Sequence, residues 1–263
     1  MNKYKKLFEG KFTYTYSHRD LSFFESIYYF ISPTTYTERT LYSALSKAVG
    51  TRRNLKILDV GCGGGHEILN DYGNVYGIDI SRKSIQNAKK IYKQATVGDL
   101  TKKLRYQSNY FDLAFCSEVF GHIEKIDKKK FLGEINRVLK PGGSFIMSAE
   151  TEGNNWLVRL LKSRNLYKKY WIDYQGHIGL LSPTKTIQSV EKYFTVTSSQ
   201  KTSTWVLSLD GYLIFFEDSL LHKLLSQNNV RLLLNILMSP LYFLSIYFSS
   251  LDSANDVVVL AKK

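Results

Sequence analysis

The feature that most constrains the fold is an apolar run that ends in an acid and then breaks into glycines, residues 55–66 with the sequence LKILDVGCGGGH. A short run of this composition is typical of a buried parallel strand. Ligands of open α/β sheets bind at the carboxyl ends of such strands. Glycines let the backbone turn sharply and approach a ligand, because no Cβ stands in the way. We therefore expect an α/β fold with a ligand-binding loop here, followed by a helix.

The spacing of the glycines separates two kinds of loop. A dinucleotide fingerprint requires G-x-G-x-x-G at the start of a helix. Gly61 and Gly63 fit this pattern, but His66 stands at its third glycine. The sequence instead gives D-x-G-x-G-x-G, from Asp59 to Gly65. A nicotinamide oxidoreductase is therefore the least favoured enzyme class, and a strand-to-helix turn without a ligand is the structural alternative.

Further strands with acids at their ends follow in order. Residues 74–81 indicate a second strand ending at Asp79, where nucleotide-binding α/β folds place a carboxylate on the ribose hydroxyls. Residues 95–100 indicate a third strand ending at Asp99. Residues 110–123 read as a fourth strand and its loop, and residues 131–147 as a helix, a Pro-Gly-Gly turn and a fifth strand.

These five segments resemble the class I S-adenosylmethionine-dependent methyltransferases, and loosely the type 11 and ubiquinone/menaquinone group. The resemblance covers roughly residues 55–150. It implies a Rossmann-like α/β three-layer sandwich with a mostly parallel seven-stranded sheet. It also implies S-adenosyl-L-methionine as the cofactor, with the glycine loop around its methionine part. The cofactor-binding residues implied are Asp59, Gly61, Cys62, Gly63, Gly65, Asp79, Ile80, Asp99, Leu100, Ser117 and Glu118.

We expect a domain boundary near residue 54. Residues 1–54 contain helical stretches at 21–31 and 36–49, and helices in this position cap the cleft in the family. Aromatic and imidazole groups of the segment that are candidates to face the site are Tyr14, Tyr16 and His18, with packing on the sheet as the alternative.

Residues 55–263 are expected to form the methyltransferase domain. In it, the sequence GHIGLLSP at residues 176–183 resembles a family segment that precedes a helix, with Ser182 as N-cap and Pro183 as the first helical residue. Strands at 194–199 and 256–261 would complete the sheet.

A helical insertion is expected at about 205–252. No charged residue occurs from Leu232 to Leu251, a length that suggests a membrane span. We disfavour a span, because it would separate the last strand from its sheet, and because Asn235, Ser239 and Pro240 interrupt the run. Two or three helices that form a lid, a dimer face or an interfacial membrane patch are expected instead, and helices packed on the domain are the alternative.

The net charge of +13 points to a basic surface, with lysines clustered at 3–6, 128–130 and 162–169. Such a surface is either simply solvated or attracts anionic partners, including lipid headgroups and nucleic acid. Nucleic acid is the less favoured partner, because no RNA-binding module is evident. The spacing of Cys62 and Cys116 suggests neither a metal site nor a disulfide, and a cytoplasmic protein with peripheral membrane contact is expected.

Methyl transfer requires a positioned acceptor and, for many acceptors, removal of a proton. His122 follows the fourth strand and His177 precedes a later helix, so these histidines are the candidate catalytic bases, with a structural role as the alternative for each. Ser117-Glu118-Val119-Phe120 differs from the (D/N/S)-P-P-(Y/F) motif of nucleobase amino-methylating enzymes. The expected acceptor is therefore a small molecule, a glycan or a lipid-linked molecule, methylated at oxygen. The alternatives are an RNA methyltransferase and a catalytically silent partner subunit.

Overall fold

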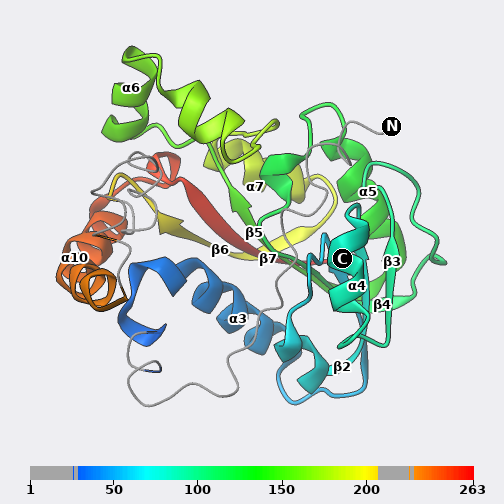
Figure 1. Cartoon of the computed structure of the whole chain (residues 1–263). Coiled ribbons are helices and arrows are strands. Elements are labelled where there is room, and N and C mark those ends of the chain that lie inside the picture. Colours follow the sequence, from blue (N-terminus) through cyan, green and yellow to red (C-terminus); the bar gives the residue numbers. More distant parts are fainter. Residues whose placement is uncertain (1–25, 27–28, 207–224, 226–227) are drawn as a thin grey trace.

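A computed structural model describes residue 26, residues 29–206, residue 225 and residues 228–263 (Figure 1). Its centre is a seven-stranded sheet in the order β3-β2-β1-β4-β5-β7-β6. The strands pair in parallel from β3 to β5, and β7 is antiparallel to both of its neighbours. The strands are β1 Leu55–Val60, β2 Gly73–Asp79, β3 Gln94–Val97, β4 Phe111–Cys116, β5 Leu139–Glu150, β6 Thr195–Ser203 and β7 Asp256–Lys262.

Helices cover both faces of the sheet, which confirms the predicted three-layer α/β sandwich (Figure 1). Side chains alternate along each strand, so neighbouring residues enter different cores. In β1, Ile57 joins the core under α3 (Tyr36–Val49) and α4 (Arg82–Ala88), while Leu58 joins the core under α5 (Lys128–Val138) and α7 (Pro183–Glu191). Because β1 to β5 pair in parallel, these strands all end at the same edge of the sheet, where a ligand site is expected.

The prediction of a helix directly after the glycine loop was wrong. The loop leads into a short 3₁₀ helix, η2 (Glu67–Asp71), and β2 begins at Gly73. So few residues return the chain to the sheet that an α-helix of several turns cannot form between the two strands. A hydrogen-bonded N-cap starts the next helix instead, where Ser84 N donates to Ser81 Oγ at the start of α4.

The helix predicted at residues 36–49 is α3, and it packs beneath β5, β6 and β7 rather than over the strand ends. Leu41, Leu45 and Val49 are buried at the predicted spacing. Tyr14, Tyr16 and His18 lie outside the described residues. The cap assignment for the remainder of residues 1–54 stays a prediction.

Between β6 and β7 the structure describes one long helix, α10 (Asn228–Phe248), with Pro240 inside it and the 3₁₀ helix η6 (Leu251–Ser253) after it. Other parts of the predicted insertion at 205–252 lie outside the described residues. Among the described helices, none combines the length and the apolar character needed to cross a membrane. One side of α10 exposes large apolar groups, namely Leu233, Ile236, Leu237, Leu241, Leu244, Tyr247 and Phe248.

The segment after β5 forms α6 (Trp156–Ser163) and a π-helical turn, η4 (Lys168–Asp173), and then leads to α7. The predicted helix start at α7 is confirmed. Lys185 N donates to the Oγ of Ser182, and Pro183 is the first residue of the helix. Proline suits this position because its missing N–H would have no partner in the first turn.

Candidate functional site

The glycine loop follows β1 at the carboxyl edge of the sheet, as predicted. Gly61, Gly63 and Gly65 adopt positive φ angles of 71°, 53° and 102°, which L side chains rarely adopt. A Cβ at Gly61 would lie 2.4 Å from Val119 Cγ2, so this loop packs directly against the loop after β4. The N–H groups of Gly61 and Cys62 donate to the carbonyl of Ile78, at 2.8 and 3.1 Å. The loop conformation thus depends on glycine.

Asp79 joins the ends of three strands. Its Oδ2 accepts from Gly63 N at 3.0 Å, and its Oδ1 accepts from Ser81 N at 2.8 Å. Its carbonyl oxygen accepts from Gly98 N at 2.9 Å, which ties β2 to the segment after β3. The predicted cofactor-binding residues Ile80, Asp99 and Leu100 lie half-buried at this edge. The structure therefore brings together the predicted residues from β1, β2 and β3.

Asp59 lies beneath the loop rather than in it. It is 1% exposed, and Tyr92 Oη donates to its Oδ2 at 2.6 Å. Tyr92 Oη in turn accepts from His66 N at 2.5 Å, and His66 Nδ1 lies 3.0 Å from Tyr42 Oη on α3. Burial raises the pKa of Asp59 to about 7 against the hydrogen bond from Tyr92, and the charge of Asp79 adds to the rise. This network links the loop to α3.

The loop after β4 packs directly against the glycine loop through Val119 and Gly61. Ser117 and Glu118 are half-buried, and Glu118 has a positive φ of 54°. Glu118 N donates to Ser148 Oγ at 3.1 Å, which fixes the loop to β5. Burial, followed by the nearby charges of Glu150 and Asp256, raises the pKa of the Glu118 carboxyl well above its usual range.

His122 and His177, the two predicted catalytic residues, meet at one carboxylate. His122 Nε2 and His177 Nε2 each lie 3.3 Å from Glu150 Oε1, and the two ring centroids are 4.9 Å apart. The side chains are 11%, 5% and 10% exposed for His122, His177 and Glu150. Burial opposes ionisation of Glu150, but attraction to His122 and hydrogen bonds with both histidines hold its pKa well below its usual range.

The backbone around this cluster is held from several sides. His122 Nδ1 lies 3.1 Å from the carbonyl of Gly176, and Gly179 N donates to the carbonyl of Gly121 at 3.0 Å. The segment that carries His177 is therefore bound to η3 (Phe120–His122). A Cβ at Gly121 would lie 2.8 Å from Glu150 Oε2, so glycine leaves room there for the carboxylate.

Lys128 adds a buried cation near the cluster. Its ammonium donates to the Phe120 carbonyl and lies 3.6 Å from the centroid of the Phe120 ring. Burial lowers the pKa of Lys128 to about 7, although the charge of Glu150 opposes the change. The predicted surface cluster of lysines at 128–130 thus loses its first member to the interior.

Sequence reasoning missed Glu150, Tyr92 and Lys128. Glu150 had a readable signal, because it ends a strand at the ligand edge as Asp59 and Asp79 do. Tyr92 and Lys128 had no such signal, because an apolar environment around a polar group depends on tertiary packing.

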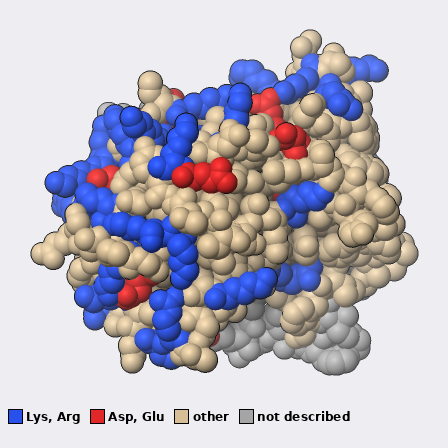
Figure 2. All heavy atoms as spheres, turned by 180° about the vertical axis from the view of Figure 1, so that it is seen from behind, with Lys and Arg blue, Asp and Glu red and all other residues tan. Residues whose placement is uncertain are grey.

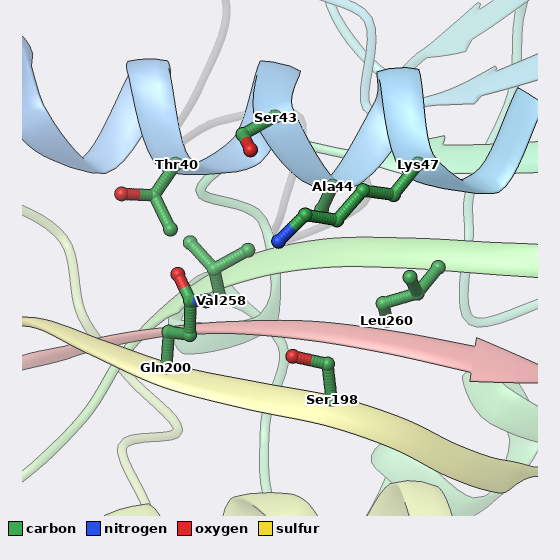
Figure 3. Close-up of a pocket in the computed structure, with 8 residues that line it drawn as sticks. All are labelled: Thr40, Ser43, Ala44, Lys47, Ser198, Gln200, Val258 and Leu260. Carbon is green, nitrogen blue, oxygen red and sulfur yellow. The ribbon is translucent and has the colours of Figure 1, made fainter. Parts of the chain in front are cut away.

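A small pocket lies elsewhere, between α3 and the middle of β6 and β7 (Figure 3). Thr40 and Lys47 of α3 face Ser198 and Gln200 of β6 across it, with Val258 between them. It opens on a face of the sheet rather than at the carboxyl edge of β1 to β4. It contains none of the predicted site residues, so we place the candidate site at the strand ends.

Comparison with known proteins agrees with this placement. The profile of a family described as a methyltransferase domain matches residues 58–147, which run from β1 into β5. A probable methyltransferase of Aspergillus luteorubrus is 35% identical over 105 residues, covering 33% of this chain and 37% of the relative. A ubiquinone/menaquinone biosynthesis C-methyltransferase of Wigglesworthia glossinidia brevipalpis is 31% identical over 142 residues, covering 49% of this chain and 55% of the relative.

Among solved structures, a protein of Pyrococcus horikoshii OT3 superposes with a TM-score of 0.50 at 27% identity, covering 66% of this chain and 92% of that one. The chain spans about a third to a half of the length of the two curated relatives. The matched region nevertheless contains the glycine loop, Asp79, Asp99 and the loop after β4. On these matches and this fold, the chain contains a methyltransferase domain that is similar to those of the class I S-adenosylmethionine-dependent methyltransferases.

Proposed function

We propose that this protein transfers a methyl group from S-adenosylmethionine to the oxygen of a small-molecule, glycan or lipid-linked acceptor. The observation that carries the proposal is the positive-φ glycine loop tied to Asp79 at the carboxyl edge of the sheet, beside a histidine–carboxylate cluster. The first part is suited to the cofactor and the second to the acceptor.

The residues at the first three strand ends fit the cofactor. The glycine loop would surround its methionine part, with Cys62 packed inside the loop. Asp79 uses one acceptor position on each oxygen for a backbone N–H, and each carboxylate oxygen can accept another hydrogen bond. It can therefore also accept from the two ribose hydroxyls, while Asp99 and Leu100 would meet the adenine. The bound cofactor supplies a methyl group on a sulfonium, already activated for displacement.

The acceptor side would be provided by the loops after β4 and β5. The packing of Val119 against Gly61 places the loop that carries His122 next to the cofactor loop. An imidazole there can take the proton of an acceptor hydroxyl as the new bond forms. This is why we favour oxygen, although a relative is named a C-methyltransferase of ubiquinone/menaquinone biosynthesis. The name of that relative, which refers to ubiquinone and menaquinone biosynthesis, supports a small-molecule or lipid-linked acceptor.

Membrane contact is part of the proposal for a lipid-linked acceptor. The exposed apolar side of α10 supports it, because a surface of this kind is unusual on a monomer without a partner. The lysines at 162–169 near α6 would add attraction to anionic headgroups.

A second candidate function, methylation of RNA, is favoured by the charge distribution. Lysine and arginine side chains gather on the face seen in Figure 2, with few acids among them. An RNA substrate would be retained on such a surface, and the retention would fall steeply as salt rises. If retention of RNA does not depend on the salt concentration, or if no RNA is retained, the small-acceptor proposal is favoured.

Calorimetry with S-adenosylhomocysteine tests the cofactor assignment. Asp79→Ala removes a charge-assisted ribose contact, so binding should weaken by about 1.5–3 kcal/mol. Asp71→Ala is a matched control, because it removes an exposed carboxylate at the end of η2. Equal affinity of the wild type and Asp79→Ala would reject the assignment, and binding of NADH in place of the cofactor would revive an oxidoreductase.

The same wild-type and Asp79→Ala proteins can be used to search for the acceptor. Cell extract, cofactor and wild-type protein are incubated together, and products heavier by one methyl group are sought by mass spectrometry. Asp79→Ala is the matched control. Products that form with the wild type but not with Asp79→Ala would identify the acceptor class. If the methylated products are RNA, the second candidate function is favoured.

A further inference from the structure

We propose that His122, Glu150 and His177 form a binding site for one divalent transition-metal ion of the zinc and iron group. The three ligand atoms, His122 Nε2, Glu150 Oε1 and His177 Nε2, all lie within 4.8 Å of one another. The cysteine spacing gave no sign of a metal site, so this cluster departs from the sequence-based expectation of none.

The distances within the cluster suit a shared ion. Each imidazole Nε2 lies 3.3 Å from Glu150 Oε1. An ion with bonds of about 2.0–2.1 Å to tetrahedral nitrogen and oxygen ligands holds those ligands about 3.3 Å apart. A direct N–H···O hydrogen bond is shorter, with a mode of about 2.9–3.0 Å. The spacing therefore fits two ligands on one ion as well as an ion pair.

The hydrogen bonding of His122 favours an ion as well. The carbonyl of Gly176 can only accept, so His122 Nδ1, at 3.1 Å, donates its proton there. Nε2 then faces the carboxylate either protonated, as a hydrogen-bond donor, or with its lone pair. In the second state a cation between the two atoms removes the repulsion between two acceptors, so a bound ion can take the place of the proton. A backbone carbonyl that fixes the tautomer is also the usual second contact of a metal-binding histidine.

The polar atoms left over point to the same conclusion. Glu150 Oε2 and His177 Nδ1 are buried and have no hydrogen-bond partner among the residues that the structure describes. Buried polar groups are normally paired, so unpaired ones indicate a missing ion or water. Gly121 leaves the space next to Glu150 Oε2 open, since a Cβ would lie 2.8 Å from that atom. The carboxylate can therefore bind an ion through one oxygen or both.

The donor set defines the class of ion. Two imidazole nitrogens and one carboxylate suit zinc, iron and cobalt, whereas magnesium prefers oxygen ligands alone. Three protein ligands leave at least one position open. In the sites that bind such ions catalytically, that position holds water or a substrate oxygen.

One consequence for the acceptor rests on the proposed function. A hydroxyl oxygen bound to the ion would lose its proton to water more readily, because the cation stabilises the oxyanion. The oxygen lone pair then forms the bond to the methyl carbon, and the electrons of the carbon–sulfur bond return to sulfur. His122 and His177 would act as ligands rather than as the base. The acceptor class is accordingly a hydroxyl compound.

Titration with Co²⁺ tests the site directly. Full-length protein without a histidine tag is stripped with chelator, and the visible absorption of Co²⁺ is followed. We expect one ion per chain, displaced by Zn²⁺ and not by Mg²⁺. Glu150→Gln keeps the side-chain volume and removes the charged ligand, so it should weaken binding at least about 100-fold. Glu191→Gln, the same change on an exposed residue of α7, should leave binding unchanged.

Three results would overturn the proposal. Wild-type protein that binds neither Co²⁺ nor Zn²⁺ would leave the cluster as an ion pair held by protons. Equal binding by the wild type and Glu150→Gln would place the ion elsewhere. If Glu150→Gln fails to fold, anomalous scattering from a wild-type crystal grown with Zn²⁺ decides, and an ion outside the cluster rejects the site. Binding of S-adenosylhomocysteine is measured separately, so failure of the metal site and failure of the cofactor assignment are distinguishable.

Discussion

Two halves of one sheet edge are built in different ways. We call the glycine loop with the ends of β1, β2 and β3 the cofactor half, and the loop after β4 with the end of β5 and His177 the acceptor half, after the roles that we propose for them. In the cofactor half, backbone N–H groups and glycine geometry fix the shape, as at Gly63 and Asp79. In the acceptor half, side chains meet from three separate segments.

The halves also differ in how many buried polar atoms lack a partner. Among the described residues, such atoms in the acceptor half are Glu118 Oε1, Glu150 Oε2 and His177 Nδ1, and the one in the cofactor half is Asp59 Oδ1. Unpaired groups in a low-dielectric interior are costly, so they persist where a ligand completes them. The difference suggests that the cofactor half is largely formed before binding, whereas the acceptor half is completed by what it binds.

The largest expected effect tests whether the halves work separately. His177→Ala removes either the base or a metal ligand, so turnover with an identified acceptor should fall about 10²–10⁴-fold. Affinity for S-adenosylhomocysteine, measured by calorimetry, should remain that of the wild type. A parallel loss of cofactor affinity, with an unchanged melting temperature, would show that the two halves form one unit and break the comparison.

The next effect tests the cofactor half alone. Gly61→Ala adds a Cβ 2.4 Å from Val119 Cγ2 on a residue with a φ of 71°. The loop must move, and affinity for S-adenosylhomocysteine should fall about 100-fold, equivalent to about 2.7 kcal/mol. Gly142→Ala is the matched control, because its φ is 73° but a Cβ there meets nothing within 4 Å. If both variants bind equally well, close packing of the loop is not what shapes the cofactor site.

The same difference explains what the sequence could predict. The fold and the cofactor half follow from contiguous signals, in which an apolar strand, an acid and glycines stand next to one another. His122 and His177 could be proposed singly as reactive groups. Their meeting at Glu150 could not, because it depends on how the segment after η4 packs on η3. The missing helix after the loop has a similar cause, since the early start of β2 overrides the local pattern.

A smaller effect concerns Asp59, whose Oδ2 accepts from Tyr92 while its Oδ1 has no partner among the described residues. Burial raises the pKa of Asp59 from 3.8 to about 7. A raised pKa means that the stability contributed by protonated Asp59 is complete below about pH 4 and is lost as pH rises towards 7. Asp59→Asn removes this loss. The unfolding free energy of Asp59→Asn minus that of the wild type should therefore increase by up to about 1.4 kcal/mol per pH unit between pH 4 and 7. Above pH 7 this difference should stay constant.

Urea unfolding at several pH values measures this difference. Asp71→Asn, at an exposed position, should show no such pH dependence relative to the wild type. A constant difference between Asp59→Asn and the wild type across this range would mean that Asp59 stays ionised in the folded protein. The cofactor half would then contain a buried charge that its surroundings stabilise, and would resemble the acceptor half more closely.

The smallest expected effect asks whether the acceptor half faces a membrane. α10 packs against the end of β6, where Tyr242 Oη donates to the Thr202 carbonyl. Ser203 of β6 and Glu150 of β5 both pair with Asp256 of β7, so α10 lies at the same edge of the sheet as the end of β5. Leu237 is 65% exposed on its apolar side. Such a surface, with attraction of about 1 kcal/mol per well-placed lysine, should bind anionic vesicles weakly and less in high salt.

Leu237→Glu should reduce sedimentation with vesicles, whereas Ile126→Glu, an 81% exposed position before α5, should not. Sedimentation that is absent at low salt, or equal for both variants, would favour a soluble acceptor and leave this face of α10 to a protein partner.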